Sequence, residues 1–317
     1  MTTDLQHLLD ALADPLQPVQ DDLLEAASDL DSPRLQAFQT AWSSWDPTRR
    51  LQVLEHLGQI ADGDIELNFD RINRLALGDE ETRVRRQAIQ NLWECEDPSL
   101  GGQLARLLEA DSSGEVRATA AAALGRFIYL GETEEIDEEL LHQVEARLLA
   151  AQRDDPDEAV RLRSLESLGY SSRPEIVQLI EAAYGSGNEG RMQSALKAMA
   201  RSASPAWEAS ILANLHHAAP GLRAEAARAA GELELPGCVD DLIELTEDGI
   251  DEVRLAAIWS LAQIGGQDAS LALTRLLESI GAPDEIALIE DGLDYIAFVD
   301  GTRDISLLDF DPEDPPR

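Results

Sequence analysis

The chain has 317 residues, with 62 Asp and Glu against 25 Lys and Arg, so its formal net charge at pH 7 is −37. This surplus of carboxylates disfavours binding of nucleic acid or of an anionic membrane surface, because both depend on clustered Lys and Arg. The hydrophobic fraction of 44% excludes a disordered acidic chain, and the length allows about two ordinary domains or one elongated domain.

A helix–turn–helix pattern repeats along the chain and is weakest in the N-terminal part. In each copy, one position in the first turn of the second helix is called here the anchor. The anchors are residues 20, 50, 85, 117, 161, 192, 223 and 254, and the last four follow one another at intervals of 31 residues. Self-similarity at a period of this size is the signature of a repeat architecture.

Each anchor helix carries an apolar stripe on one face, at the position before the anchor and three, four and seven positions after it. In two of the copies these residues are Val84, Ala88, Ile89 and Leu92, and Val253, Ala257, Ile258 and Leu261. The next position is often glycine, which favours a helix end or a close helix crossing. This glycine occurs as Gly58, Gly125, Gly169 and Gly231.

Another helix precedes each anchor helix, for example over 174–184, 205–216, 239–245 and 268–280. Aspartate often stands six residues before the anchor, where it is expected to cap backbone N–H groups of the turn. These aspartates are Asp14, Asp79, Asp111, Asp155 and Asp248. One such unit cannot bury its stripe alone, so neighbouring units must stack.

The sequence predicts one repeat array over residues 1–297. It comprises degenerate repeats over 1–75, the best copies over 76–266 and a capping helix pair over 267–297. Anchors 117 and 161 lie 44 residues apart, which indicates an insertion of about 13 residues around 131–137. An acidic, Pro-containing tail is expected over 298–317, with disorder over 309–317.

The pattern D-x-x-x-x-V-R-x-x-A-x-x-x-L-G, clearest over 111–125 and 155–169, resembles HEAT-like repeats. It is most similar to the short type named after phycobilisome lyases. The resemblance implies an all-α, right-handed α-solenoid, an armadillo-like superhelix of about eight to nine repeats. It also implies that the second helices line a concave face and that turn Asp and anchor Arg form ladders between repeats. Members of the family are mostly protein-binding scaffolds, and a few are enzymes or chromophore-attachment factors.

The anchor arginines allow two interpretations, a structural ladder and a row of anion ligands. Because they recur with the architecture, we favour the ladder. They are Arg85, Arg117, Arg161, Arg223 and Arg254.

No motif points to catalysis, so we predict no catalytic residue, no cofactor and no metal. His216 and His217 are adjacent and would point about 100° apart on a helix, which disfavours chelation of one ion. The sequence has no His–Glu dipeptide, which excludes the iron site of the HEAT-like enzyme deoxyhypusine hydroxylase. Cys95 and Cys238 lack metal or disulfide spacing and are read as free thiols. The N-terminus has no signal-peptide pattern, so we expect a cytoplasmic protein.

The anchor-helix positions opposite the apolar stripe are expected to line the groove. They are acidic and amide-rich in the first half of the chain, whereas basic residues gather in the middle. From these positions we predict a basic, aromatic partner-binding surface, because Arg and aromatic residues are usual interface anchors. A solvated face with incidental arginines is the alternative. The predicted partner-binding residues are Arg126, Arg163, Tyr170, Lys197, Arg201, Arg228 and Trp259.

Trp93 replaces the usual small residue after Leu92. We interpret it as a core residue at an irregular repeat junction, with an exposed binding anchor as the alternative.

The sequence therefore favours a non-enzymatic scaffold or adaptor that binds another protein, whose surface we expect to be basic. No nucleic-acid or membrane partner is expected. Two alternatives stay open: a subunit resembling bilin lyases, which attach a chromophore, and an acidic mimic of nucleic acid that sequesters basic proteins.

Overall fold

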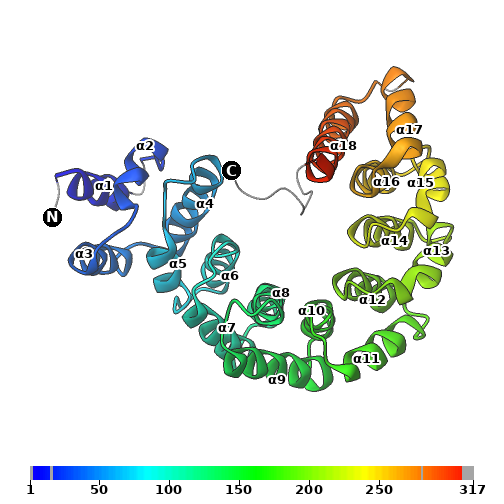
Figure 1. The fold of residues 1–317 in the computed structure, drawn as a ribbon. Helices are drawn as coiled ribbons and strands as arrows, with labels where there is room; N and C mark the ends of the chain where they lie inside the picture. The colour runs from blue at the N-terminus through cyan, green and yellow to red at the C-terminus, as the bar shows by residue number, and fades with distance from the viewer. Residues whose placement is uncertain (1–2, 15–16, 280, 309–317) are drawn as a thin grey trace, which may run out of the picture. The chain divides into compact units, whose positions relative to one another are not determined.

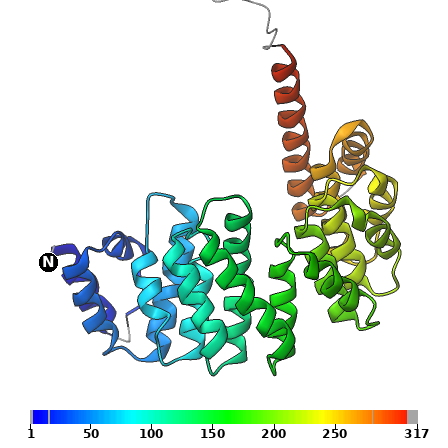
Figure 2. The same ribbon diagram turned by 60° about the horizontal axis from the view of Figure 1, so that its bottom comes forward.

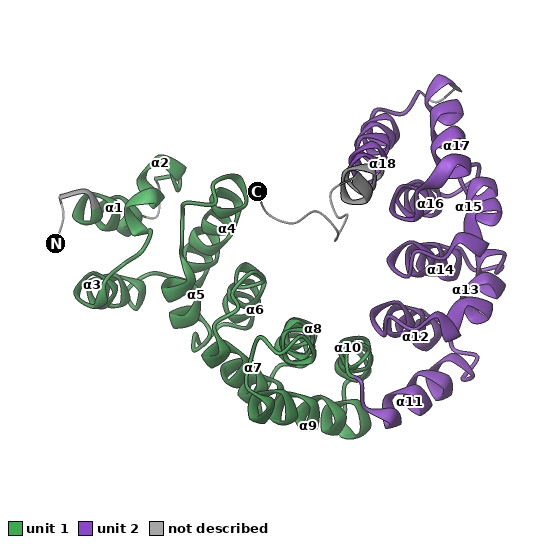
Figure 3. Ribbon diagram, viewed as in Figure 1, with its two compact units in different colours: residues 1–171 green, residues 172–317 purple. Residues whose placement is uncertain are grey.

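The computed structural model describes residues 3–14, 17–279 and 281–308. It divides into two compact units, unit 1 (Met1–Ser171) and unit 2 (Ser172–Arg317) (Figure 3). Every regular element in the described ranges is a helix, which confirms the predicted all-α class. The predicted disorder over 309–317 lies outside the described residues. None of the described helices has the length and apolar character needed to cross a membrane.

Unit 1 consists of consecutive helix pairs (Figure 1). Its elements are α1 (Thr3–Ala13), α2 (Asp21–Leu24), the 3-10 helix η1 (Glu25–Ala27), α3 (Ser32–Trp42), α4 (Pro47–Gly63), α5 (Asp70–Ala76), α6 (Thr82–Asn91), α7 (Pro98–Ala110), α8 (Gly114–Glu132), α9 (Glu138–Asp154) and α10 (Glu158–Leu168). Within this unit α4, α6, α8 and α10 stack side by side as an inner row, and α5, α7 and α9 form an outer row (Figures 1 and 2).

Unit 2 repeats the same plan. Its elements are α11 (Pro174–Tyr184), α12 (Glu189–Arg201), η2 (Pro205–Trp207), α13 (Glu208–Leu215), α14 (Pro220–Glu232), η3 (Pro236–Cys238), α15 (Val239–Leu245), α16 (Asp251–Ile264), α17 (Gly266–Ser279) and α18 (Pro283–Leu308). Here α12, α14, α16 and α18 pack in sequence, with α13, α15 and α17 outside them. Each unit is thus a stack of helix pairs, as the predicted α-solenoid requires.

The expected insertion lengthens helices more than it lengthens a loop. α8 has 19 residues and α9 has 17, and only residues 133–137 connect them. At the C-terminal end, α18 continues to Leu308, into the segment that the sequence analysis assigned to the tail.

The predicted apolar stripes form the core of the helix stack. Val84, Ala88, Ile89 and Leu92 are at most 4% exposed, and Val253, Ala257, Ile258 and Leu261 are fully buried. Each buried aliphatic side chain contributes about 1.5–3 kcal/mol relative to an exposed one. Stacking of neighbouring pairs supplies this burial, since each inner helix packs both on an outer helix and on the next inner helix.

A ladder of arginines joins neighbouring repeats in both units, which confirms the structural interpretation for Arg85, Arg117, Arg223 and Arg254. The fifth predicted arginine, Arg161, donates to the carbonyl of Asp155 in its own turn. Arg117 donates through Nε and Nη2 to the carboxylate of Asp155 at 2.8 and 2.9 Å, and through Nη1 to the backbone carbonyl of Asp111 at 2.9 Å. The other ion pairs of the ladder are Arg50–Asp79, Arg85–Asp111, Arg223–Asp248 and Arg254–Glu285.

The turn aspartates serve two purposes at once. Asp155 accepts from Arg117 and also caps its own turn, where its Oδ1 accepts the backbone N–H of Asp157 at 2.9 Å. Asp248 does the same with Arg223 and the N–H of Ile250. The last pair of the array uses Glu285, which lies on the capping helix α18 and is 5% exposed. Each carboxylate therefore fixes both a turn and the register of two repeats.

Glycine allows the closest approach between inner helices. A Cβ built on Gly231 of α14 would lie 2.8 Å from the Cα of Ser260 on α16 and 2.7 Å from its Oγ. The hydroxyl of Ser260 donates to the carbonyl of Ala227 at 2.7 Å across this contact. The backbones of α14 and α16 are therefore too close for any side chain at position 231.

We expect Arg117→Gln to lower the free energy of unfolding by about 3 kcal/mol at pH 7, since it leaves the carboxylate of Asp155 buried without its cation. Burial alone would raise the pKa of Asp155, but bonds from Arg117 and from the N–H of Asp157 outweigh it and hold the pKa below its usual value. A depressed pKa stabilises the fold above the unfolded-state pKa of about 4, and this contribution is lost as the pH falls through the folded-state pKa.

Urea unfolding of Arg117→Gln and the wild type at pH 7 and pH 3 measures this difference, which should shrink at the lower pH. The exposed pair Arg147–Glu109 provides the control, because Arg147→Gln should cost about 0–1 kcal/mol. Equal effects of the two substitutions would contradict the ladder.

Gly231→Ala should lower the unfolding free energy by about 1–3 kcal/mol, because the new methyl group must push apart the backbones of α14 and α16. Gly63→Ala is the matched control, since no atom lies within 4 Å of the Cβ built on Gly63 at the end of α4. Thermal or urea midpoints should fall for the first variant and stay level or rise for the second.

Candidate protein-binding surface

The inner row of unit 1 carries two neighbouring hollows. The first, called here the acidic hollow, has a volume of about 660 Å³ and lies between α4 and α6. Glu55 and Asp62 border it from the first helix, and Gln90 and Glu94 border it from the second and from the turn that follows. Among the residues that the structure describes, no lysine or arginine belongs to its lining. The hollow therefore presents carboxylates without a cation of its own.

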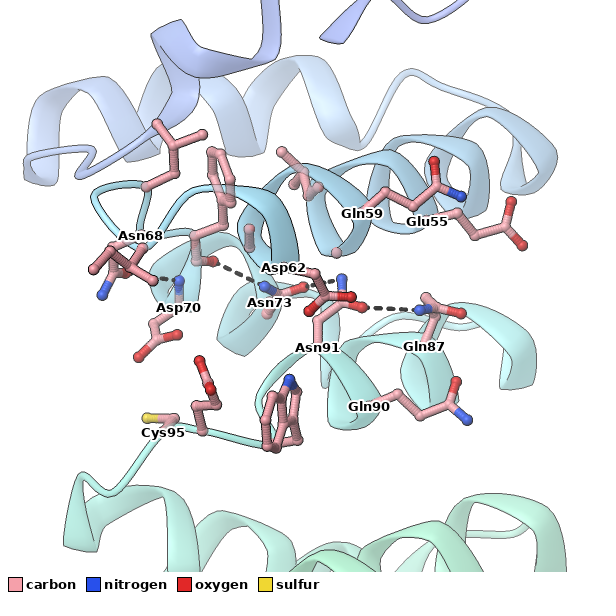
Figure 4. A pocket seen from close by; sticks show the side chains of 18 residues that line it. Glu55, Gln59, Asp62, Asn68, Asp70, Asn73, Gln87, Gln90, Asn91 and Cys95 are labelled. Atoms are coloured by element: carbon pink, nitrogen blue, oxygen red, sulfur yellow. Dashed lines mark hydrogen bonds between the residues drawn. The ribbon is translucent and has the colours of Figure 1, made fainter. Parts of the chain in front are cut away.

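A network of amides forms the floor of the acidic hollow (Figure 4). Gln87 donates to Asn91 at 2.8 Å, and Asn91 donates to the side-chain oxygen of Asn73 at 3.0 Å and to the carbonyl of Leu54 at 2.8 Å. The amide of Asn73, which is 3% exposed, donates to the carbonyl of Phe69. These bonds tie α4, α5 and α6 together, so the floor is a rigid structural element and the carboxylates above it remain for a ligand.

The second hollow, called here the arginine groove, has a volume of about 520 Å³ and lies between α6 and α8. Its floor is apolar and includes Leu92, Leu104 and Phe127, all of which are buried. Small residues of α8, Ala118, Ala122 and Ala123, line one side and leave the groove open. Trp93, Arg126 and Arg163 complete its lining.

Trp93 is 59% exposed and lines both hollows, so its interpretation as a core residue is wrong. The residue follows the last turn of α6, where the chain leaves the helix stack for α7. At this point the helical wheel no longer specifies which way a side chain points. The signal in the sequence was the loss of the small residue at this repeat position.

Two predicted binding residues, Arg126 and Arg163, line the arginine groove together. Arg126 lies on α8 and donates to the carboxylate of Glu96 and to the carbonyl of Trp93. Its Nε atom is buried and has no hydrogen-bond acceptor. Arg163 lies on α10, and its Nη1 donates to the nearly buried Glu166 at 2.6 Å. Both guanidinium groups are thus held in place by acidic neighbours.

Tyr170, a further predicted residue of unit 1, lies outside the lining of both hollows. It meets Tyr129 edge to face, with ring centroids 5.8 Å apart, and Tyr129 is 51% exposed. The repeat pattern does not predict Tyr129, because that residue lies in the extended last turns of α8, beyond the regular repeat.

The predicted residues of unit 2 form a network of ions. Glu225 of α14 pairs with Lys197 of α12 at 3.6 Å and with Arg228 at 2.7 Å, and Arg228 also reaches Glu252 at 3.0 Å. Lys197 and Arg228 are therefore already matched by carboxylates of the same chain. This part of the surface alternates in charge.

Arg201 lies in the last turn of α12 and acts on the nearby carboxylate of Glu232. Partial burial raises the pKa of Glu232, and the negative charge of Glu225 raises it further. Arg201 lowers this pKa more than the other nearby cations do. Glu232 keeps an exposed surface, so water still reaches it. Trp259 of α16 is half-buried, and its ring packs where a Cβ on Gly231 would stand, 2.8 Å away.

The structure thus separates the seven predicted residues into groups: Arg126 with Arg163 in unit 1, Tyr170 beside Tyr129, and the ion network with Trp259 in unit 2. Their role in binding a partner remains a prediction.

Burial raises the pKa of both thiols of the chain. Cys95 and Cys238 are free and buried. Burial, with smaller contributions from Glu208 and Asp241, raises the pKa of Cys238 to about 11. A thiol is nucleophilic only as the thiolate, so this environment suppresses reactivity at neutral pH. The described residues contain no group of three or more His, Cys, Asp or Glu side chains that could hold a metal ion.

Comparisons with known proteins place the repeats in a family. A family model described as HEAT repeats matches residues 71–141 and 208–290. An uncharacterized phycocyanin operon protein Z from Pseudanabaena tenuis (strain PCC 7409) is 31% identical over 137 residues, which are 42% of this chain and 65% of that protein. The alignment therefore spans slightly less than two thirds of that relative's length.

Solved structures with a similar fold have low sequence identity. The complex of CpcE and CpcF of phycocyanin lyase from Nostoc sp. PCC7120 is 18% identical with a TM-score of 0.46, covering 72% of this chain and 94% of that chain. Human deoxyhypusine hydroxylase in complex with glycerol is 18% identical with a TM-score of 0.39, covering 93% and 96%. The repeat period, the arginine–carboxylate ladder and the matched ranges together confirm the resemblance drawn from the sequence: the chain contains HEAT repeats over residues 71–141 and 208–290.

Proposed function

We propose that this protein is a non-enzymatic adaptor that binds another protein on its inner helices. The observation that carries the proposal is the exposed indole of Trp93 between two open hollows. Tryptophan and arginine are enriched among the residues that dominate binding energy at interfaces. Stacked repeats present extended surfaces of this kind, which other proteins commonly occupy.

The charge of the chain supports a partner with a basic surface. A net charge of −37 creates a negative potential that attracts cationic proteins and repels nucleic acid. Such steering raises the association rate at low ionic strength and is screened by salt. Short-range contacts at Trp93 and the arginine groove would then supply the selectivity that a diffuse field lacks.

We expect the triple variant Arg126→Gln, Arg163→Gln and Lys197→Gln to lose the partner while remaining folded, because it removes three cations of the inner helices. The control triple variant Arg106→Gln, Arg147→Gln and Arg153→Gln removes the same charge from exposed positions of α7 and α9. Affinity capture from native lysate, followed by mass spectrometry, compares both with the wild type, and circular dichroism monitors folding.

Equal capture by all three proteins would reject the adaptor proposal for this surface. A different result, release of many basic proteins together when salt is raised above about 0.15 M, would favour the acidic mimic of nucleic acid. One selective partner retained at that ionic strength supports the adaptor.

A second candidate function is that of a subunit related to chromophore attachment. The similarity to a phycocyanin operon protein favours it, as does the arginine groove, whose Trp93 and Phe127 could contact a planar ring system. The guanidinium groups of Arg126 and Arg163 could pair with the propionate carboxylates of a linear tetrapyrrole, since Arg binds carboxylates through two parallel bonds.

Mixing the protein with a linear tetrapyrrole tests this second function. A bound chromophore should shift or intensify its visible absorption, and Trp93→Ala and Arg163→Gln should each reduce that change. An unchanged spectrum at saturating protein concentration would remove the chromophore function and leave the adaptor as the proposal.

A further inference from the structure

Trp93 lies between two hollows, one lined by carboxylates and the other by arginines. Trp93, Gln90 and Cys95 line both the acidic hollow and the arginine groove, so the two are contiguous. A ligand that covers the indole ring must therefore extend into one hollow, the other, or both.

On one side of Trp93, the carboxylates are available to a cation. Glu55, Asp62 and Glu94 are exposed, and no Lys or Arg lines the acidic hollow with them. Like charges gathered without a counterion repel one another and attract a cationic ligand. A lysine or arginine of a partner would meet these carboxylates beside the indole.

On the other side of Trp93, the arginine groove has an apolar floor, and the guanidinium groups of Arg126 and Arg163 lie at its edge. Leu92, Leu104 and Phe127 would surround a bulky apolar side chain that enters from the inner face. The side chain of Arg163 is 47% exposed, and its Nη1 donates to Glu166. The side chain of Arg126 is 34% exposed, so a ligand carboxylate can also approach its guanidinium group.

We propose that the inner face of unit 1 binds an extended segment of a partner protein in which a bulky apolar residue is flanked by carboxylates on one side and by Lys or Arg on the other. The apolar residue enters the arginine groove against Trp93, the carboxylates pair with Arg163 and Arg126, and the basic residues lie over the acidic hollow. This inference rests on the proposed function and gives its partner a charge order along the bound segment.

Charge complementarity excludes the simpler ligands. A uniformly basic peptide would place cations beside Arg126 and Arg163, and a uniformly acidic one would place carboxylates beside Glu55 and Asp62. Each arrangement brings like charges together at short distance, which discriminates against the wrong partner.

The test is a selection of random 12-residue peptides displayed on phage against the full-length chain. We expect enrichment of peptides with an apolar residue between acidic and basic flanks, in one chain direction. Trp93→Ala should abolish that enrichment, whereas Phe298→Ala, which removes an aromatic ring of 69% exposure from unit 2, should leave it unchanged. Enrichment of uniformly basic peptides, or no enrichment, would overturn the inference.

A synthetic peptide with the enriched sequence then reports on each contact by fluorescence anisotropy. Trp93→Ala should weaken its binding at least about tenfold. Arg163→Gln should weaken binding of this peptide. It should have little effect on a peptide whose Asp is replaced by Asn, because the two changes remove the same ion pair. Glu55→Gln should show the same coupling to the peptide's Lys, and Arg147→Gln on α9 should show none.

The outcome separates this inference from the proposed function. If no such peptide is found but the triple variant of the inner helices still loses its partner, the adaptor function stands and the charge order proposed here is wrong. If the effects of Arg163→Gln and Glu55→Gln on binding do not depend on the charged residues of the peptide, the two hollows do not select the peptide by its charge and the inference also fails.

Discussion

The whole architecture depends on one constraint: a single helix pair of this chain cannot bury its own apolar stripe. Val84, Ala88 and Ile89 of α6 are buried in a stack in which α6 packs on α4, α5 and α8. Hydrophobic burial supplies the free energy of this stacking, whereas the arginine ladder specifies its register. One anchor arginine holds the carbonyl of its own turn and the carboxylate of the following turn, so consecutive repeats cannot slide past each other without breaking both bonds.

Because hydrophobic burial and the arginine ladder together hold the stack, the inner surface can differ from repeat to repeat. The stripe and the ladder occupy two faces of each inner helix, and the remaining face is the one on which the repeats differ. In unit 1 that face changes from carboxylates and amides to alanines and arginines within two repeats, and Trp93 stands where the two meet. In unit 2 the same face is filled by the ion pairs around Glu225. A shared fold therefore provides two chemically different surfaces.

Much of the candidate surface could be foreseen from helical periodicity. Arg126 was expected on the inner face of its helix, and it lines the arginine groove together with Thr119 and Ala122 of the same helix. The prediction failed for Trp93, because that residue lies in the turn after α6, where helical geometry no longer applies. The sequence also presented Arg163 and Lys197 as simple cations. Their pairing with Glu166 and Glu225 depends on rotamers and on contacts between helices, which periodicity does not encode.

By itself the sequence determined the helix pairs, the buried stripe and the ladder arginines Arg85, Arg117, Arg223 and Arg254, because these features are local or recur at a fixed interval. Only the tertiary structure decided that an exposed indole separates an acidic hollow from an arginine groove, and which carboxylates neutralise which arginines. The physical reason is distance along the chain: Arg126 meets Glu96 and Arg228 meets Glu252 across neighbouring repeats. Such contacts follow from how closely the helices approach each other, which small residues such as Gly231 set in each interface.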